Sequence, residues 1–260
     1  MSESAGKALD ILFYLAKVGE GVSLARLSKE TGMNKATALR YLTVLESKGV
    51  VERCLAGWML GLSLFELGSK VPVRQLVAEK VRPIIERLAR ETGESANLAY
   101  LAGDTAIYLD RAEANRSLRM RSMPGDRLPL YCTGVGKTIL SQLTEERIRA
   151  ILGPGPLRKI TDSTLTDPED IIHEAMRARE LGYGVDREEF EIGLTCYAMP
   201  LRLPGSDFVG AISISGPTAR MKNPEIREHF LAILRQAVQD ATDMLSPYHY
   251  FENIPEHRGD

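Results

Sequence analysis

The chain has 260 residues, of which 44% are apolar, and it carries 33 lysines and arginines against 35 aspartates and glutamates. This composition is typical of a globular protein, and the length allows one or two domains that need no disulfide or structural metal. No apolar stretch reaches the roughly 18 residues of a membrane-spanning helix, and residues 1–7 lack a signal-peptide pattern. We therefore expect a cytoplasmic protein with no membrane contact.

The three cysteines argue against two further classes of protein. Cys54, Cys132 and Cys196 are odd in number, widely spaced and never part of a CxxC pair. Neither a disulfide framework nor a zinc finger is therefore expected, and the thiols are expected to be reduced.

Charge is distributed unevenly along the chain. The first sixty residues hold eight basic and six acidic side chains, a net charge of +2, and the other 200 residues therefore carry −4. A mildly basic head on an acidic body fits a DNA-binding domain attached to a sensor domain, but two charges is a small asymmetry. The order of apolar and polar residues therefore has to show whether the first sixty residues form a DNA-binding domain.

The first fifty residues contain three segments with helical patterns. Apolar residues recur at helical spacing over 5–17, which predicts an amphipathic helix. Ser23 can cap a short second helix, and Gly32 stands where that helix would end in a left-handed turn. Asn34 can cap a third helix that extends to Lys48. Two helices joined by a short turn with a glycine are the signature of a helix-turn-helix.

The predicted third helix has one apolar face and one polar face. Its apolar side chains fall within about 120° of one another and predict a buried face: Ala38, Leu39, Leu42 and Leu45. The polar face is either ordinary solvated surface or a DNA-binding surface, and strands predicted at 50–53 and 58–60, which would form a wing, favour DNA. We expect Lys35 and Arg53 to contact phosphates. The expected DNA-binding residues are Asn34, Lys35, Thr37, Arg40, Tyr41 and Arg53.

Beyond residue 61 the pattern changes to mixed helices and strands. A short helix over 62–70 ends at Val71 and Pro72, which place a domain boundary there. Antiparallel strands flanked by helices predict an α+β sensor domain, with a hairpin turn at 204–207. The expected strands are 97–101, 106–111, 118–121, 183–187, 194–202 and 207–215. The expected helices are 74–91, 134–142, 144–151, 168–181 and 223–244.

Residues 131–138 read YCTGVGKT, which is similar to the end of a nucleotide-binding loop. Such a loop requires a glycine five residues before its last glycine, and Tyr131 occupies that position, so we do not expect ATP binding. Gly134 and Gly136 instead allow the N-terminus of a helix to approach another group closely. The free amides of such an N-terminus suit a carboxylate.

Two serines lie in the apolar strand predicted at 207–215. Neither Ser213 nor Ser215 stands centrally between glycines, as a nucleophile elbow requires, and strand alternation places both hydroxyls on one face. They are either structural serines or, together with Asp186 and Cys196, a polar cluster. No histidine has ligand spacing with this cluster and the sequence indicates no base for the cysteine, so we expect neither a metal site nor a cysteine nucleophile.

Taken together, these residues resemble the IclR family of bacterial transcriptional regulators over essentially the whole chain. In the head, the similar residues are Leu27, Ser28, Thr31, Gly32, Lys35, Ala36, Thr37, Arg40, Tyr41, Leu42 and the run 58–61. In the C-terminal part, they are the runs 129–131, 133–137 and 186–189, with Gly193, Cys196, Gly210, Ala211, Ser213 and the run 215–217.

The resemblance implies a winged helix-turn-helix domain at 1–61, a linker helix at 62–72, a GAF-like effector-binding domain at 73–250 and a tail at 251–260. It also implies a small organic acid or aromatic carboxylate as effector. Tyr131 and Val135 depart from the residues usual in the family, so the effector can differ in size. The implied effector-binding residues are Gly134, Val135, Asp186, Cys196, Ser213 and Ser215, with Met120 and Leu194 as an apolar wall.

Three functions remain open at this point. A ligand-gated regulator explains both halves of the chain, a small-acid-metabolising enzyme explains only the pocket, and a constitutive architectural DNA-binding protein explains only the head. We therefore predict a regulator, a repressor rather than an activator, and no enzyme, cofactor or metal. Because one head offers few base contacts, and because the family is commonly dimeric or tetrameric, we expect a homodimer or homotetramer on a palindromic DNA operator.

Overall fold

The computed structural model describes residues 3–113, 123–203 and 207–245. Contacts between residues divide the chain into two compact units, with the division between Pro72 and Val73. None of the helices in the described residues is both long enough and apolar enough to cross a membrane. The strand predicted at 118–121, the tail at 251–260 and all but Asp207 of the predicted turn lie outside the described residues.

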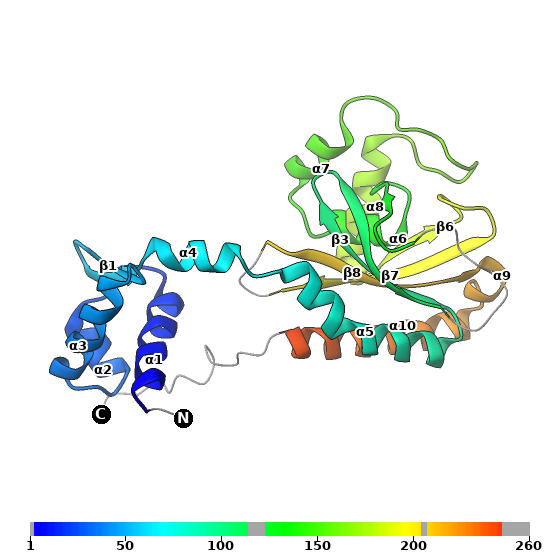
Figure 1. Cartoon of the computed structure of the whole chain (residues 1–260). Coiled ribbons are helices and arrows are strands. Elements are labelled where there is room, and N and C mark those ends of the chain that lie inside the picture. The colour runs from blue at the N-terminus through cyan, green and yellow to red at the C-terminus, as the bar shows by residue number, and fades with distance from the viewer. Residues whose placement is uncertain (1–2, 114–122, 204–206, 246–260) are drawn as a thin grey trace. The chain divides into compact units, whose positions relative to one another are not determined.

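The first unit has the predicted winged helix-turn-helix fold (Figure 1). Its elements are α1 (Glu3–Val18), α2 (Leu24–Glu30), α3 (Lys35–Ser47) and the antiparallel hairpin of β1 (Val51–Cys54) and β2 (Gly57–Leu60). Both predicted caps are confirmed, because the Ser23 Oγ accepts from the Arg26 amide at 3.3 Å and the Asn34 Oδ1 accepts from the Thr37 amide at 2.8 Å. Gly32 has a φ of 67°, the left-handed conformation predicted for the turn.

One apolar cluster holds the first unit together, and it includes Ile11, Leu15, Leu27, Ala38, Leu42, Val51 and Trp58. A backbone bridge between Val22 and Trp58 ties the wing to the segment before α2. The expectation that Leu39 belongs to this core is wrong, because its side chain is 40% exposed. The buried stripe of α3 follows Ala38 and Leu42, and Leu39 lies about 100° around the helix from Ala38.

Helix α4 (Leu62–Ser69) follows the wing and buries none of its residues. Its large apolar side chains are exposed, and Leu62 and Phe65 have relative exposures of 76% and 79%. Leu67 is exposed as well. The helix therefore presents apolar surface to solvent, which monomeric proteins seldom do over a contiguous patch.

The second unit is built on a six-stranded antiparallel sheet with the strand order β5-β4-β3-β8-β7-β6. The strands are β3 (Ser95–Ala102), β4 (Thr105–Ala112), β5 (Arg127–Leu128), β6 (Gly184–Arg187), β7 (Leu194–Arg202) and β8 (Val209–Pro217). Helices α5 (Val73–Thr92) and α10 (Pro224–Leu245) cover one face of the sheet, whereas α6 (Gly134–Leu140), α7 (Glu145–Leu152) and α8 (Pro168–Leu181) lie on the other (Figure 1). The architecture is the predicted α+β fold, with one short helix, α9 (Thr218–Met221), and the two-residue strand β5 that were not predicted.

Side-chain alternation separates the two faces of this sheet. On β8, Ile212 and Ile214 pack toward α5 and α10, whereas Ser213 and Ser215 face the side of α6. The pairing of β3 with β4 contains a β-bulge, and in the resulting register Arg111 lies opposite Asn97. The bulge therefore places Arg111 on the same face as the two serines.

Candidate functional site

The exposed side of α3 carries most of the residues expected to contact DNA. Lys35 and Arg40 are exposed and Thr37 is half-buried. The Arg40 guanidinium lies 5.4 Å from the centroid of the neighbouring Tyr41 ring. Asn34 uses its Oδ1 as the helix cap, so its amide NH₂ is the part of the side chain left for an outside contact.

Tyr41 joins α3 to α1. Its ring packs against the apolar cluster of the first unit, and its hydroxyl lies 3.1 Å from the Ser4 Oγ. The hydrogen bond with Ser4 lowers the pKa of this hydroxyl. Tyr41 thus links α3 to α1, and a DNA contact by its hydroxyl has to compete with Ser4.

Arg53 lies on the wing beside the C-terminal half of α3. Its Nε is 3.2 Å from the Glu46 Oε1, and its guanidinium lies 4.6 Å from the centre of the Trp58 ring. Both members of the ion pair are exposed, and exposed pairs of this kind contribute only about 0–1 kcal/mol to stability. A DNA phosphate can therefore replace Glu46 at little cost.

In the second unit, a row of buried polar side chains crosses the face of the sheet on the side of α6. Strand pairing joins Arg111 to Asn97, Asn97 to Ser213, Ser215 to Cys196, and Cys196 to Asp186. We call these six residues the polar row: Arg111, Asn97, Ser213, Ser215, Cys196 and Asp186. The sheet thus brings together the four polar residues that were expected to form one cluster.

Three buried polar residues beside that cluster were missed by the sequence analysis. The Asn97 Nδ2 donates to the Ser213 Oγ at 3.1 Å and to the Ser215 Oγ at 3.3 Å. The side chain of Arg111 is 3% exposed, with Glu113 at 3.5 Å. Tyr108 is also buried, and burial raises the pKa of its hydroxyl. Strand alternation could have indicated Asn97, whereas Arg111 reaches this face only through the bulge.

Helix α6 covers the polar row, and all seven of its residues are buried. Thr133 caps the helix, with its Oγ1 accepting from the Gly136 amide at 3.1 Å, and its carbonyl accepts from the Lys137 amide. No described residue accepts from the amides of Gly134 and Val135. The Val135 side chain belongs to an apolar cluster, so Val135 can meet a ligand through its amide.

Gly134 lies directly against the polar row. A Cβ on this residue would lie 3.2 Å from both the Cβ and the carbonyl oxygen of Cys196, and 3.5 Å from the Asp186 amide nitrogen. The predicted close approach of this helix N-terminus is therefore confirmed. The free amides of α6 stand at the Asp186 end of the row.

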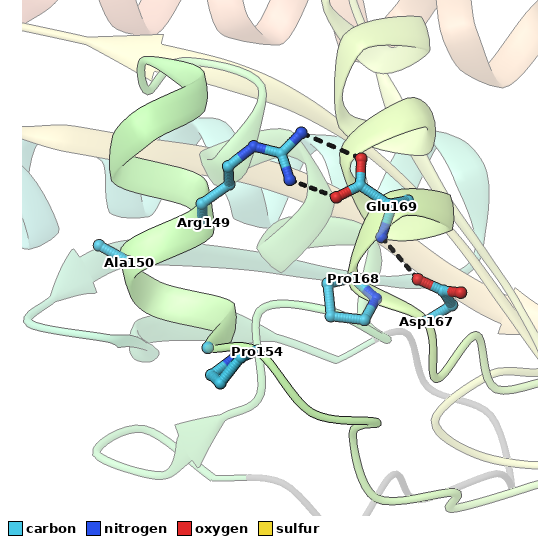
Figure 2. Close-up of a pocket in the computed structure, with 7 residues that line it drawn as sticks. Arg149, Ala150, Pro154, Asp167, Pro168 and Glu169 are labelled. Carbon is cyan, nitrogen blue, oxygen red and sulfur yellow. Dashed lines mark hydrogen bonds and ion pairs between the residues drawn. The ribbon is translucent and has the colours of Figure 1, made fainter.

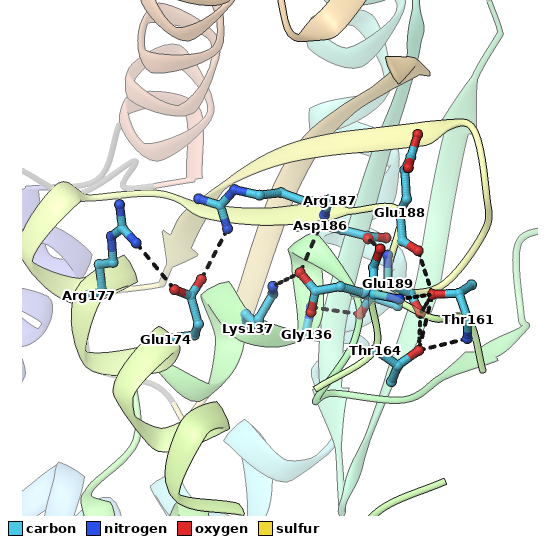
Figure 3. Close-up of polar contacts among 12 residues, drawn as sticks. Gly136, Lys137, Thr161, Thr164, Glu174, Arg177, Asp186, Arg187, Glu188 and Glu189 are labelled. Atoms are coloured by element: carbon cyan, nitrogen blue, oxygen red, sulfur yellow. Dashed lines mark hydrogen bonds and ion pairs between the residues drawn. The ribbon is translucent and has the colours of Figure 1, made fainter. Parts of the chain in front are cut away.

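A buried charged cluster borders the same end of the row (Figure 3). The Lys137 Nζ donates to the Glu189 Oε1 at 2.5 Å, and both side chains are almost fully buried. The Asp186 Oδ1 accepts from the Glu189 amide at 2.7 Å. Lys137, which gave the motif its likeness to a nucleotide-binding loop, is thus an internal counter-ion.

Burial determines the protonation of the polar row. It raises the pKa of Asp186 to about 7, against the lowering effect of the hydrogen bond from the Glu189 backbone. Burial also raises the pKa of the Cys132 thiol to about 12 and that of Cys196 as well. Both thiols therefore stay protonated near neutral pH and are poor nucleophiles. Among the described residues, no cluster of His, Cys, Asp or Glu side chains could hold a metal ion.

Of the two residues expected to form an apolar wall, Leu194 is among the described residues. Leu194 packs with Cys196 in a small buried cluster beside the polar row. Met120 lies outside the described residues.

A cavity of about 590 Å³ lies elsewhere in the second unit, between α7 and α8 (Figure 2). Arg149 and Glu169, which both line it, already form an ion pair, and Arg149 also binds Glu145. Asp167 caps α8 by accepting from the Glu169 amide at 2.9 Å. The polar row is buried, and among the described residues its Asn97 Oδ1 has no hydrogen-bond partner, so it is the better candidate for a ligand site.

Both units of the chain match domains of known proteins. Residues 4–54 match the IclR helix-turn-helix domain, and residues 70–242 match the C-terminal domain of the bacterial transcriptional regulator IclR. The chain is 34% identical over 233 residues to the HTH-type transcriptional regulator BhcR of Paracoccus denitrificans, covering 89% of this chain and 83% of BhcR. It is 33% identical over 222 residues to the HTH-type transcriptional repressor AllR of Escherichia coli K12, covering 85% of this chain and 82% of AllR.

A solved structure shows the same fold. It is an IclR homologue from Microbacterium hydrocarbonoxydans complexed with 4-hydroxybenzoate, with a TM-score of 0.62 and 23% identity, covering 92% of this chain and 100% of that chain. The two matching domains and the relatives aligned along most of their length show that the chain belongs to the IclR family of bacterial transcriptional regulators, which bind DNA and are not enzymes.

Proposed function

We propose that this protein is a ligand-responsive transcriptional repressor of the cytoplasm, which binds a palindromic operator as a homodimer or homotetramer and responds to a small organic acid or aromatic carboxylate. The observation that carries the proposal is the polar row, where buried polar side chains converge with free helix amides on a face that usually holds aliphatic residues. The relative AllR is a repressor, and the homologue with 4-hydroxybenzoate holds an aromatic carboxylate.

The DNA contacts are assigned to the outward side of α3. In a helix-turn-helix, the N-terminal half of the second helix meets base edges in the major groove, and Lys35, Thr37 and Arg40 occupy that half. Asn34 precedes them, and Arg53 flanks them on the wing. Tyr41 is the last of the proposed DNA-binding residues. It either holds α3 against α1 or contacts DNA directly.

Replacing Arg40 with Ala should weaken operator binding by roughly 5- to 150-fold, the effect of losing one good base contact, and should leave the fold intact. The operator can be selected from a random pool of duplexes, and affinity measured by fluorescence anisotropy. Lys17→Ala, which removes the same charge from the exposed end of α1, is the matched control and should change affinity little. Equal affinity of the wild-type protein for operator and random DNA would contradict sequence-specific binding.

Helix α4 is the surface in the first unit best suited to self-association. Leu62 and Phe65 lie on one side of it, and both are largely exposed. A second copy of the same helix can bury them across a two-fold axis, which is the symmetry that a palindromic operator requires.

Phe65→Glu should therefore shift the protein toward the monomer and lower its operator affinity, because a buried charge opposes the apolar interface. Sedimentation velocity measures the oligomeric state directly. Lys70→Glu places a negative charge just after the same helix without touching its exposed apolar residues, and it should leave the assembly intact. An unchanged oligomer in Phe65→Glu would place the interface elsewhere.

The carboxylate of the effector is assigned to the donors around the polar row. The free amides of Gly134 and Val135 and the hydroxyls of Ser213 and Ser215 can donate to its oxygens. The proposed walls of this place are Cys196, Leu194 and Met120. Asp186 can join the donors in its protonated form, whereas its ionised form repels an anion.

Effector affinity should accordingly fall as the pH rises. Because burial raises the pKa of Asp186 to about 7, this carboxyl group loses its proton between about pH 6 and about pH 9 while a carboxylate effector stays ionised. Calorimetry on the full chain across that window should show a rising dissociation constant, approaching roughly ten-fold per pH unit at the upper end. In Asp186→Asn the dependence should flatten. The same slope in both proteins would show that another group titrates.

Effector and operator should change each other's affinity by the same factor. A typical coupling free energy of about 1–3 kcal/mol corresponds to a change of roughly 5- to 150-fold. Calorimetry with keto, hydroxy and aromatic acids, with and without operator, measures this factor. A repressor loses operator affinity with effector, whereas a gain would indicate an activator of the same architecture.

The double variant Ser213→Ala/Ser215→Ala is the control for that measurement. It should lose effector binding and the coupling but retain operator binding, because both serines lie in the second unit. Identical effector affinities with and without operator would show that the polar row is not a regulatory site.

A further inference from the structure

Asn97 is the member of the polar row that contacts both serines. Its side chain is fully buried, and its Nδ2 donates to the hydroxyl oxygens of both Ser213 and Ser215. It lies on β3, between Arg111 on β4 and the serines on β8. One planar amide group therefore binds both serine hydroxyls.

This arrangement fixes what the serine hydroxyls can do. A hydroxyl group has one proton to donate, and its oxygen can accept at the same time. Since the Ser213 and Ser215 oxygens accept from Asn97, their own protons must point elsewhere. Ser215 also interacts with the Cys196 thiol, and no described residue accepts from Ser213. The Ser213 proton is therefore available to an acceptor on a ligand.

The oxygen of the Asn97 side-chain amide is a hydrogen-bond acceptor, whereas its nitrogen is the donor. In the part of the chain that the structure describes, its Oδ1 is buried and has no hydrogen-bond partner. A buried carbonyl oxygen without a partner is destabilising, so a ligand that donates to it gains affinity. The row thus offers a free acceptor directly beside a free donor.

A plain carboxylate satisfies only part of this site. Its oxygens accept from hydroxyls and amides, but it has no proton to give to the Asn97 Oδ1. Because the Asn97 amide carries this oxygen and also binds both serines, the ligand group that donates to Oδ1 must lie close to the carboxylate. A hydroxyl on the adjacent carbon meets that requirement.

We propose that Asn97 is a specificity-determining residue, which makes the polar row select 2-hydroxy carboxylates over the same acids without the hydroxyl. The proposal rests on the function proposed above for the polar row as the effector site. Asn97 orients the Ser213 proton toward the carboxylate and accepts from the hydroxyl of the ligand through its Oδ1.

The test compares three pairs of acids that differ by one hydroxyl: glycolate with acetate, lactate with propionate, and mandelate with phenylacetate. Calorimetry on the full chain gives each dissociation constant. In every pair small enough to fit the site, the hydroxy acid should bind about ten-fold tighter or more than the acid without the hydroxyl. The latter leaves the Asn97 Oδ1 without a hydrogen-bond partner.

Two variants separate the roles within the site. Asn97→Leu keeps a similar volume without either polar atom, so the hydroxy acids should lose affinity and the difference within each pair should shrink to about three-fold or less. Ser213→Ala removes a donor to the carboxylate, so both members of a pair should weaken by a similar factor. Circular dichroism and thermal unfolding establish that each variant is folded.

Asn97→Asp keeps the proposal testable if Asn97→Leu does not fold. It replaces the donating NH₂ with an oxygen, which in its ionised form accepts from the serine hydroxyls and turns their protons away from the ligand. Because burial favours the protonated form, binding is measured across a pH series and compared with that of Ser213→Ala at each pH. All the acids should then lose binding, by a larger factor than in Ser213→Ala. Binding that stays unchanged in Asn97→Asp across the whole pH series, relative to the wild-type protein at the same pH, would show that Asn97 does not orient the serines.

The outcomes distinguish the two levels of the proposal. Equal affinities within every pair that binds the wild-type protein would overturn the selection of 2-hydroxy acids and leave the carboxylate site standing. A preference that persists unchanged in Asn97→Leu would overturn the assignment to Asn97. Failure of all six acids to bind the wild-type protein would instead overturn the proposed effector site.

Discussion

A buried polar group has to find a hydrogen-bond partner. This constraint governs the face of the six-stranded sheet that α6 covers. Leaving such a group unpaired costs about 1–3 kcal/mol, so polar side chains on a buried face are arranged in connected sets. Here Asn97 connects two serines on the neighbouring strand, and Asp186 accepts from the amide of Glu189. The few atoms that the set leaves without partners are then the places where a ligand gains most.

Two local backbone features bring the polar side chains and the amides of α6 together on one face of the sheet. The bulge in the pairing of β3 with β4 brings Arg111 to the face that carries Asn97, while Asp110 turns to the other face and binds Arg82 of α5. The absence of a side chain at Gly134 lets α6 press its N-terminus against Cys196. The polar row is thus assembled from strand register, and one close backbone approach adds the helix amides.

The sequence was most informative where structure depends on neighbouring residues. The caps at Ser23 and Asn34 follow from local chemistry, and the common face of Ser213 and Ser215 follows from strand alternation. Features that depend on distant partners were harder to predict. An apolar arc on a helix does not say how much of it the other helices cover, so Leu39 was wrongly placed in the core.

The candidate site also combines features that depend on neighbouring residues with features that depend on distant ones. A bulge changes the face of every residue beyond it, and it leaves no mark that one sequence reveals, so Arg111 was missed. The polar character of Asp186, Cys196 and the serines could be read from the chain, but their assignment to an effector came from the family resemblance. Strand order, which brings β6 beside β7 and β7 beside β8, was needed to place them in one row.

The chain contains a single tryptophan, Trp58, and it lies almost fully buried in the wing. Its indole ring sits beneath the guanidinium of Arg53, an exposed side chain that is held by one exposed ion pair. Tryptophan emission from this protein therefore comes entirely from the first unit and depends on the state of the wing. The molecule carries its own optical reporter, which distinguishes events in the head from events in the sheet domain without any added label.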